Sequence, residues 1–287
     1  MSKESQTFTL ADGRDVGYGE WGDPNGAPVF FFHGTPGSRI LTKTFEESAN
    51  KKGIRLIGTD RPGYGLSTLH EGRTVLDHAD DVRQLADHLG VDGFGVAGAS
   101  GGGPYVFACA QEFPERVFGG LAICTVGPPE SFSDEMRQMF EAVAANPEQS
   151  EQQMGMMIQM VEADRAGYIK NLLENAITDK WRPLAEQKVH MLEAFVDHHV
   201  EGQRNGAAGS LQEQKLILEP WGFDVEDIKV PIRIWVGALD VLAPHAHWLH
   251  EKLKDSRLEV VEEAGHIDAM WITDEVLEPL VELVPAR

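Results

Sequence analysis

The chain has 287 residues, 42% of them hydrophobic and 25% charged, which is the composition of a globular protein large enough to bury a core without disulfides or metals. Its 46 Asp and Glu residues outnumber its 25 Lys and Arg residues, and the formal net charge is −21. Nucleic acids and anionic membrane surfaces are bound mainly through Lys and Arg. The charge therefore argues against both as partners, and it does not indicate a substrate.

Two cysteines, Cys109 and Cys124, are too few for a disulfide framework or a cysteine-rich zinc site, and we expect both to be reduced and buried. Residues 1–15 contain no apolar stretch of the kind found in secretory signals, and no apolar run is long enough to cross a bilayer. These features predict a cytoplasmic protein without a membrane partner. A homodimer is kept as an alternative to a monomer.

Strands are expected wherever a short apolar run ends in turn residues, and the first pair is a hairpin with Asp12-Gly13 as its turn. The predicted strands are 7–10, 16–20, 28–32, 55–58, 93–97, 119–125, 230–237 and 258–262. Helices are predicted at 75–89, after 102 to about 112, at 245–253, and after 266. Because strands and helices alternate, the sequence predicts an α/β fold with a parallel sheet.

This alternation stops at Pro128-Pro129 and resumes near residue 230. The stretch between them is rich in methionine, has a helical pattern and is nearly free of strand signals. We therefore predict one α/β core domain, formed by residues 1–128 and 220–287, with a helical insertion at residues 129–219.

The segment Gly98-Ala99-Ser100-Gly101-Gly102 fits the pattern G-x-S-x-G between a predicted strand and a predicted helix. Such a sharp turn needs small neighbours and raises the serine hydroxyl above the sheet, at a helix N-terminus that favours negative charge. A glycine-rich phosphate loop is the main alternative. The run lacks both the G-x-G opening and the G-K-[ST] ending of such loops, so we interpret Ser100 as a nucleophile.

A serine hydroxyl becomes a strong nucleophile when a histidine, oriented by a carboxylate, takes its proton. Asp240 and His266 follow two predicted strands, at the edge where open α/β sheets place their ligands. They also follow Ser100 in the order serine, acid, histidine. His33 precedes the serine and is expected to support the loop around it, while Asp60 is expected in an ion-paired turn.

Other acids and histidines fit these roles less well. Asp268 lies too close to His266 in the sequence to orient it, and Thr125 is not an acid at a strand end where an acid could stand. His245, His247 and His250 do not share one helix face, so no metal site is predicted.

An acyl-transfer reaction also needs N–H donors for the negative charge that develops on the carbonyl oxygen. Gly101, directly after the nucleophile, supplies one candidate. The loop His33-Gly34-Thr35-Pro36-Gly37 follows the first predicted parallel strand and supplies the other. Because proline has no N–H, Thr35 is the expected donor in that loop.

Five segments in this order resemble the α/β-hydrolase fold family, of the bacterial serine hydrolase type with a helical cap: HGTPGS (33–38), DRPGYGLS (60–67), GASGGGPY (98–105), VGALDVLAP (236–244) and AGHIDAMW (264–271). The resemblance implies an eight-stranded, mostly parallel sheet flanked by helices. It further implies a triad of Ser100, Asp240 and His266, an oxyanion hole at Thr35 and Gly101, a cap at 129–219, and no cofactor.

The family resemblance implies a small-molecule substrate, and we expect hydrolysis of a carboxylic ester or lactone through an acyl-enzyme. Cleavage of a carbon–carbon bond in a vinylogous diketone by the same triad, or ligand binding with little turnover, are the alternatives. Dehalogenases and epoxide hydrolases of the family resemble one another in using aspartate where this chain has Ser100. Met154, Met157 and Trp181 of the insertion are the candidates for the substrate pocket. The alternative for the methionines is packing between the helices of the insertion, and the alternative for Trp181 is a position in the core.

Overall fold

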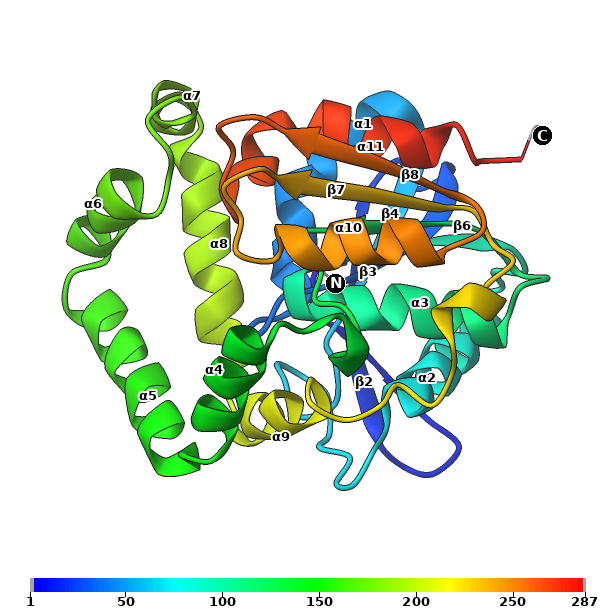
Figure 1. Cartoon of the computed structure of the whole chain (residues 1–287), viewed down its shortest axis with the longest axis horizontal. Helices are drawn as coiled ribbons and strands as arrows, with labels where there is room; N and C mark the ends of the chain where they lie inside the picture. Colours follow the sequence, from blue (N-terminus) through cyan, green and yellow to red (C-terminus); the bar gives the residue numbers. More distant parts are fainter. Residues whose placement is uncertain (1–2, 286–287) are drawn as a thin grey trace.

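A sheet of eight strands runs through the centre of the protein (Figure 1). The structure is a computed structural model that describes residues 3–285. Six strands are parallel, and β2 joins them antiparallel, with β1 at the edge in the order β1-β2-β4-β3-β5-β6-β7-β8. The strands are β1 (Gln6–Thr9), β2 (Asp15–Gly22), β3 (Ala27–Phe32), β4 (Ile54–Thr59), β5 (Phe94–Ala99), β6 (Val117–Ile123), β7 (Ile232–Gly237) and β8 (Ser256–Val261).

Helices cover both faces of this sheet, as a parallel arrangement requires. One group consists of α1 (Glu46–Lys52) and α11 (Thr273–Val281), which contact each other and the sheet. The other consists of α2 (Val75–His88), α3 (Gly103–Glu112) and α10 (Ala243–Lys252), which Figure 1 shows on the opposite side of the strands. The eight-stranded, mostly parallel α/β fold predicted from the sequence is confirmed.

The predicted elements differ from the observed ones mainly at their ends. The strand expected at 119–125 is β6 and ends at Ile123, because Cys124 has a φ of +46° and leaves the extended conformation. The helix expected at 75–89 is α2, whose first turn is closed by reciprocal hydrogen bonds between Thr74 and Asp77. After the first parallel strand, where the sequence indicated a helix without bounds, the structure has the 3-10 helix η1 (Arg39–Phe45) followed directly by α1.

Between β6 and β7 the chain forms helices, and residues 124–231, all of them described, contain no strand. These helices lie beside the sheet, with α5 and α6 farthest from it in Figure 1 and α8 against η1. They are η3 (Pro129–Ser131), α4 (Asp134–Ala144), α5 (Pro147–Ala163), α6 (Arg165–Asn175), α7 (Arg182–Gln187), α8 (Val189–Gly202), α9 (Ala208–Leu216) and, closer to β7, the short 3-10 helix η4 (Val225–Asp227). The division into a core domain and a cap stays a prediction, and residues 1–2 and 286–287 of that core lie outside the described range.

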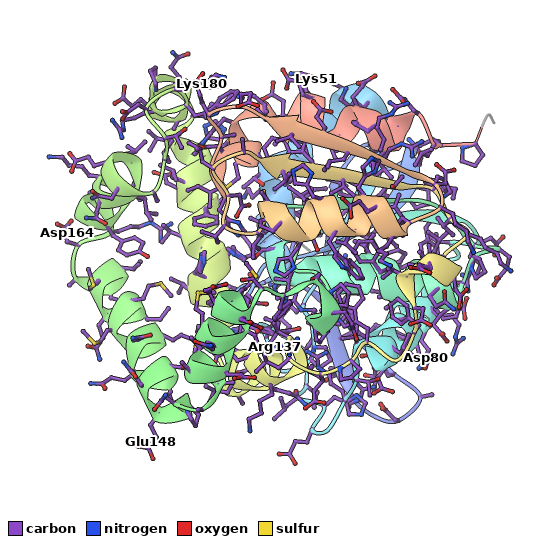
Figure 2. All side chains as sticks on the ribbon, in the orientation of Figure 1. Lys51, Asp80, Arg137, Glu148, Asp164 and Lys180 are labelled. Atoms are coloured by element: carbon purple, nitrogen blue, oxygen red, sulfur yellow. The ribbon has the colours of Figure 1, made fainter. Side chains whose placement is uncertain are left out.

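Charged side chains lie around the periphery, where Figure 2 labels Lys51, Asp80, Glu148, Asp164 and Lys180. The centre of the sheet is apolar, and Phe30, Phe31 and Phe32 of β3 are fully buried. No helix within residues 3–285 has the length and hydropathy needed to cross a lipid bilayer.

Candidate active site

Ser100 lies at the turn between β5 and the short helix η2 (Ser100–Gly102), and its φ is +54°. A residue with a side chain rarely adopts this left-handed conformation, and such strain is concentrated at functional sites. The turn is possible because two glycines approach other backbone closely. A Cβ at Gly98 would collide with the Gly102 carbonyl, and one at Gly102 would collide with the carbonyl oxygen of Phe32.

Asp240 and His266 come together at the carboxyl edge of the sheet, after β7 and β8. The His266 Nδ1 lies 2.8 Å from Asp240 Oδ2, and the backbone N–H of Leu242 donates to Asp240 Oδ1 at 2.9 Å. Burial alone would raise the pKa of the Asp240 carboxyl, but the hydrogen bonds with His266 and Leu242 outweigh it and hold that pKa below the usual value. The pair thus has the geometry of a base and its orienting carboxylate.

Ser100 and His266 border the same small cavity, of about 140 Å³. Among the described residues, no hydrogen bond joins the Ser100 hydroxyl to the His266 ring, and the His266 side chain is 40% exposed. Hydrogen bonds between nucleophile and base are often long in unliganded sites and tighten when a substrate binds. The structure therefore places the three predicted residues at one site without joining all three by hydrogen bonds.

The two expected oxyanion donors, Thr35 and Gly101, are neighbours. A Cβ at Gly101 would collide with the Thr35 side chain and lie 3.6 Å from the Thr35 backbone nitrogen. The N–H of Gly101 belongs to the first turn of η2, where it has no partner within the helix. The N–H of Thr35 donates to no other group in the described part of the chain. Both N–H groups are thus open to a ligand.

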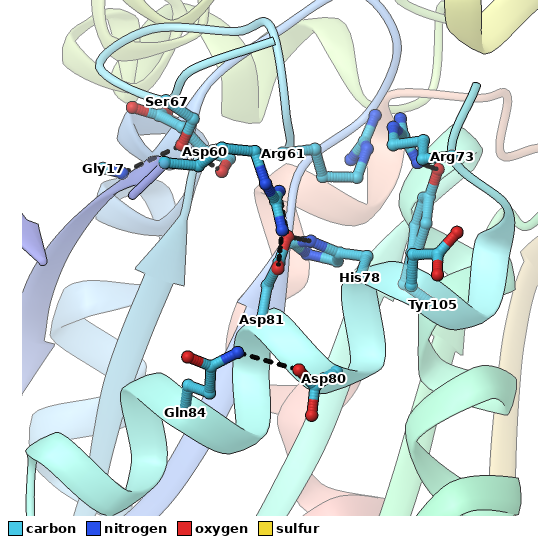
Figure 3. Close-up of polar contacts among 12 residues, drawn as sticks. Gly17, Asp60, Arg61, Ser67, Arg73, His78, Asp80, Asp81, Gln84 and Tyr105 are labelled. Atoms are coloured by element: carbon cyan, nitrogen blue, oxygen red, sulfur yellow. Dashed lines mark hydrogen bonds and ion pairs between the residues drawn. The ribbon is translucent and has the colours of Figure 1, made fainter. Parts of the chain in front are cut away.

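A buried ion-pair network holds the loop that contains Thr35, residues 33–38. The Arg61 guanidinium donates to the carbonyl oxygens of His33 and Gly34, and at 2.7 Å to the Thr35 hydroxyl. Its counter-ion is Glu213 of α9, at 3.1 Å. Glu213 also pairs with Arg73 at 3.1 Å and accepts a hydrogen bond from the Tyr105 hydroxyl; Figure 3 shows Arg61 and Arg73 above Tyr105.

The helix α8 is also held against this loop. The His198 ring fills the space that a side chain at Gly37 would need, and its Nδ1 accepts from the Ser38 N–H at 2.9 Å. Farther along, Gly202 packs on the Gly37 backbone. The absence of side chains at these two glycines allows the helix to lie directly on the loop.

His33 and Asp60 have structural positions, in line with their predicted roles. His33 is fully buried, and its Nε2 accepts from the backbone N–H of Arg61 at 3.2 Å. Asp60 forms a buried ion pair at 2.6 Å with Arg39 of η1, a partner that the sequence pattern did not indicate. The Ser67 hydroxyl, in the following turn, donates a hydrogen bond to the backbone carbonyl oxygen of Asp60 at 2.6 Å, and Figure 3 shows the two residues side by side.

Cys124 was predicted only as a buried thiol, and it lies beside the Asp240 carboxylate. Burial and the neighbouring Asp240 raise the pKa of the Cys124 thiol well above its usual value, so the thiol keeps its proton and donates toward the carboxylate. Cys124, Asp240 and His266 are the one set of three potential metal ligands within 4.8 Å of one another in the described residues. The Asp240–His266 hydrogen bond already uses the facing atoms of two of them.

A second, larger cavity of about 490 Å³ also borders Ser100. Met154 and Met157 of α5 line it, at the positions where the sequence suggested pocket residues. Trp181 lines neither cavity at Ser100: it packs in the contacts between the insertion and the core, with Lys180 above its ring. The expectation for Trp181 therefore does not hold, because its ring is used in packing.

The profile of a protein family described as alpha/beta hydrolase fold matches residues 27–271. The chain belongs to the α/β hydrolase fold family. It is 35% identical over 123 residues to a bifunctional esterase/perhydrolase of Acinetobacter calcoaceticus, a stretch that spans 42% of this chain and 44% of that protein. It is 26% identical over 247 residues to a non-heme chloroperoxidase of Streptomyces lividans, spanning 84% of each chain.

Among solved structures, an esterase from Exiguobacterium antarcticum superposes with a TM-score of 0.72 at 22% identity, over 98% of this chain and all of the other. At this identity the similarity shows the fold alone. These three proteins carry names of different activities, so the reaction of this chain must be argued from its own site.

Proposed function

We propose that this α/β hydrolase cleaves a small, neutral carboxylic ester or lactone through an acyl-enzyme on Ser100. The observation that carries the proposal is the 2.8 Å hydrogen bond between Asp240 and His266, at the cavity that Ser100 borders. No Lys, Arg, Asp or Glu side chain is found among the described residues that line either cavity. An uncharged substrate fits such a lining best.

The proposed reaction begins when Ser100 Oγ attacks the ester carbonyl carbon. His266 accepts the hydroxyl proton on Nε2, since Nδ1 is engaged by Asp240. The carbonyl oxygen becomes negatively charged and receives hydrogen bonds from the N–H groups of Thr35 and Gly101. The C–O bond to the alcohol then breaks, and His266 returns its proton to the departing oxygen.

The acyl group remains bound to Ser100 until water attacks the same carbonyl carbon. His266 takes a proton from this water, and a second tetrahedral intermediate forms. When it collapses, the bond between the acyl carbon and Ser100 Oγ breaks, His266 returns the proton to Oγ, and the carboxylic acid is released. In this proposal helices of residues 129–219 act as the cap, because α4, α5, α6, α8 and α9 supply much of the lining of the larger cavity.

The test is hydrolysis of p-nitrophenyl acetate and butyrate by the purified chain and by Ser100→Ala. We expect multiple turnovers by the wild type and a loss in kcat on the order of 10⁴-fold or more in the variant. A vinylogous diketone is assayed in parallel. Faster turnover of the diketone than of the esters, or ester turnover that survives Ser100→Ala, would contradict the proposal.

A further inference from the structure

His199 of α8 borders both of the cavities at Ser100. Four residues line both of them: Thr35, Pro36, Ser100 and His199. Three of these belong to the candidate nucleophile and to the oxyanion loop. The fourth is a histidine that the proposed reaction does not use, and its ring borders both of the cavities that Ser100 borders.

The hydrogen bond that His199 makes determines which of its ring nitrogens is left free for a ligand. Its Nδ1 lies 2.8 Å from the backbone carbonyl oxygen of Phe195, one turn earlier in α8. A carbonyl oxygen can only accept, so Nδ1 carries the proton. In the neutral ring, Nε2 then has a free lone pair, and no described residue donates to it.

The surroundings keep this ring neutral. Burial lowers the pKa of His199, and the hydrogen bond to Phe195 only partly opposes that effect. No described carboxylate lines either cavity to stabilise an imidazolium. The ring is also held firmly, because α8 is joined to the loop by the Ser38–His198 hydrogen bond and by the Arg39–Glu201 ion pair at 2.8 Å.

A fixed acceptor at the junction of the cavities requires a donor on the ligand, close to the reacting group. We propose that His199 Nε2 accepts a hydrogen bond from a hydroxyl one or two carbons away from the ester group, so that the preferred substrates are neutral hydroxy esters. This inference rests on the proposed ester hydrolysis and narrows its substrate class. Large, purely apolar esters would leave the acceptor unpaired or force it to retain water.

Matched esters test the inference. In the first set the varied substituent is on the acyl side of the ester: ethyl 2-hydroxybutanoate is compared with ethyl 2-methoxybutanoate and ethyl 2-methylbutanoate. A second set, 2-hydroxyethyl, 2-methoxyethyl and propyl butanoate, places it on the alcohol side. We expect kcat/KM to favour the hydroxy ester of at least one set by about 10-fold, the effect of one hydrogen bond.

Variants identify the acceptor through one ratio, kcat/KM for the hydroxy ester divided by kcat/KM for the matching methoxy ester. Effects common to both esters cancel in this ratio. In His199→Phe the preference is expected to fall to about 1, whereas His199→Gln, which keeps a carbonyl acceptor, retains most of it. The matched control is His190→Phe, an exposed histidine on the same helix that lines neither cavity, and it should keep the wild-type ratio.

A second measurement does not depend on the folding of His199→Phe. In Ser100→Ala labelled with ¹⁵N-histidine, the Nε2 resonance of His199 should shift when ethyl 2-hydroxybutanoate is added and stay in place with the methoxy ester. A wild-type ratio near 1 together with efficient hydrolysis of simple esters would overturn the inference and leave the proposed function standing. So would a ratio that His199→Phe preserves. Absence of any ester turnover by the folded wild type would overturn both.

Discussion

The Arg61 guanidinium and the Glu213 carboxylate form a fully buried ion pair, with 3.1 Å between Nε and Oε2, that joins the loop after β4 to α9. The same guanidinium holds the backbone of His33 and Gly34 and the Thr35 hydroxyl. The candidate oxyanion loop and the helical insertion are therefore connected through one buried positive charge. Burial raises the pKa of Glu213, but Arg61 and Arg73 outweigh it and keep that pKa below the usual value, so the pair is charged.

Replacing Glu213 by Gln should destabilise the protein by about 3–5 kcal/mol, because Arg61 and Arg73 would stay buried without a carboxylate. The free energy of unfolding in urea measures this loss. The control is Glu219→Gln, an exposed position just after α9, where the change should stay within about 0.5 kcal/mol. Equal stabilities of the two variants would show that the buried network contributes little.

Glycine at position 102 should be irreplaceable for a different reason. A Cβ there would meet the carbonyl oxygens of Phe32 and His33, so Gly102→Ala should cost about 1–3 kcal/mol of stability through overpacking and displace Ser100. Gly155, in the middle of α5, has no atom within 4 Å of the corresponding Cβ position. Gly155→Ala should therefore stabilise the protein by up to about 1 kcal/mol. Thermal unfolding of both variants checks the opposite signs.

Stability should fall as the pH drops below about 6.5. Burial lowers the pKa of His245 to about 4, and its Nδ1 lies 2.6 Å from the Ser131 hydroxyl. Between pH 6.5 and 4 the unfolded chain therefore binds a proton at this residue that the folded chain does not, so acid favours unfolding. Between these pH values, the slope of the unfolding free energy against pH gives the number of protons taken up on unfolding. In His245→Gln this number should be lower by about one. An unchanged slope would contradict the assignment.

The larger cavity should set the size of the substrate. Met154 lines it from α5, whereas Met156, on the same helix, is 53% exposed and lines neither cavity. Met154→Trp should lower kcat/KM for p-nitrophenyl octanoate more than for the acetate, because the added ring occupies cavity volume. Met156→Trp should leave the octanoate-to-acetate ratio unchanged. The proposal for this cavity fails if both variants change the ratio equally.

The fold could be predicted largely because its signals are local. The strand at 28–32 and the turn around Ser100 could each be predicted from neighbouring residues alone. His199 and Glu213 gave no such signal, since each meets the site only after α8 and α9 pack against loops more than a hundred residues away in the sequence. Trp181 shows a different limit: its residue type suits a pocket wall and a core position equally well, and only the packing of the helices decides between the two.

Covalent labelling of Ser100 tests the central proposal most directly. The folded protein is treated with a fluorophosphonate, and the modified residue is located by mass spectrometry of its peptides. We expect one adduct, on Ser100, that is absent in Ser100→Ala and preserved in Ser256→Ala, a serine on β8 outside both cavities. An adduct that persists in Ser100→Ala, or a folded wild type that does not react, would contradict the assignment of Ser100 as the nucleophile.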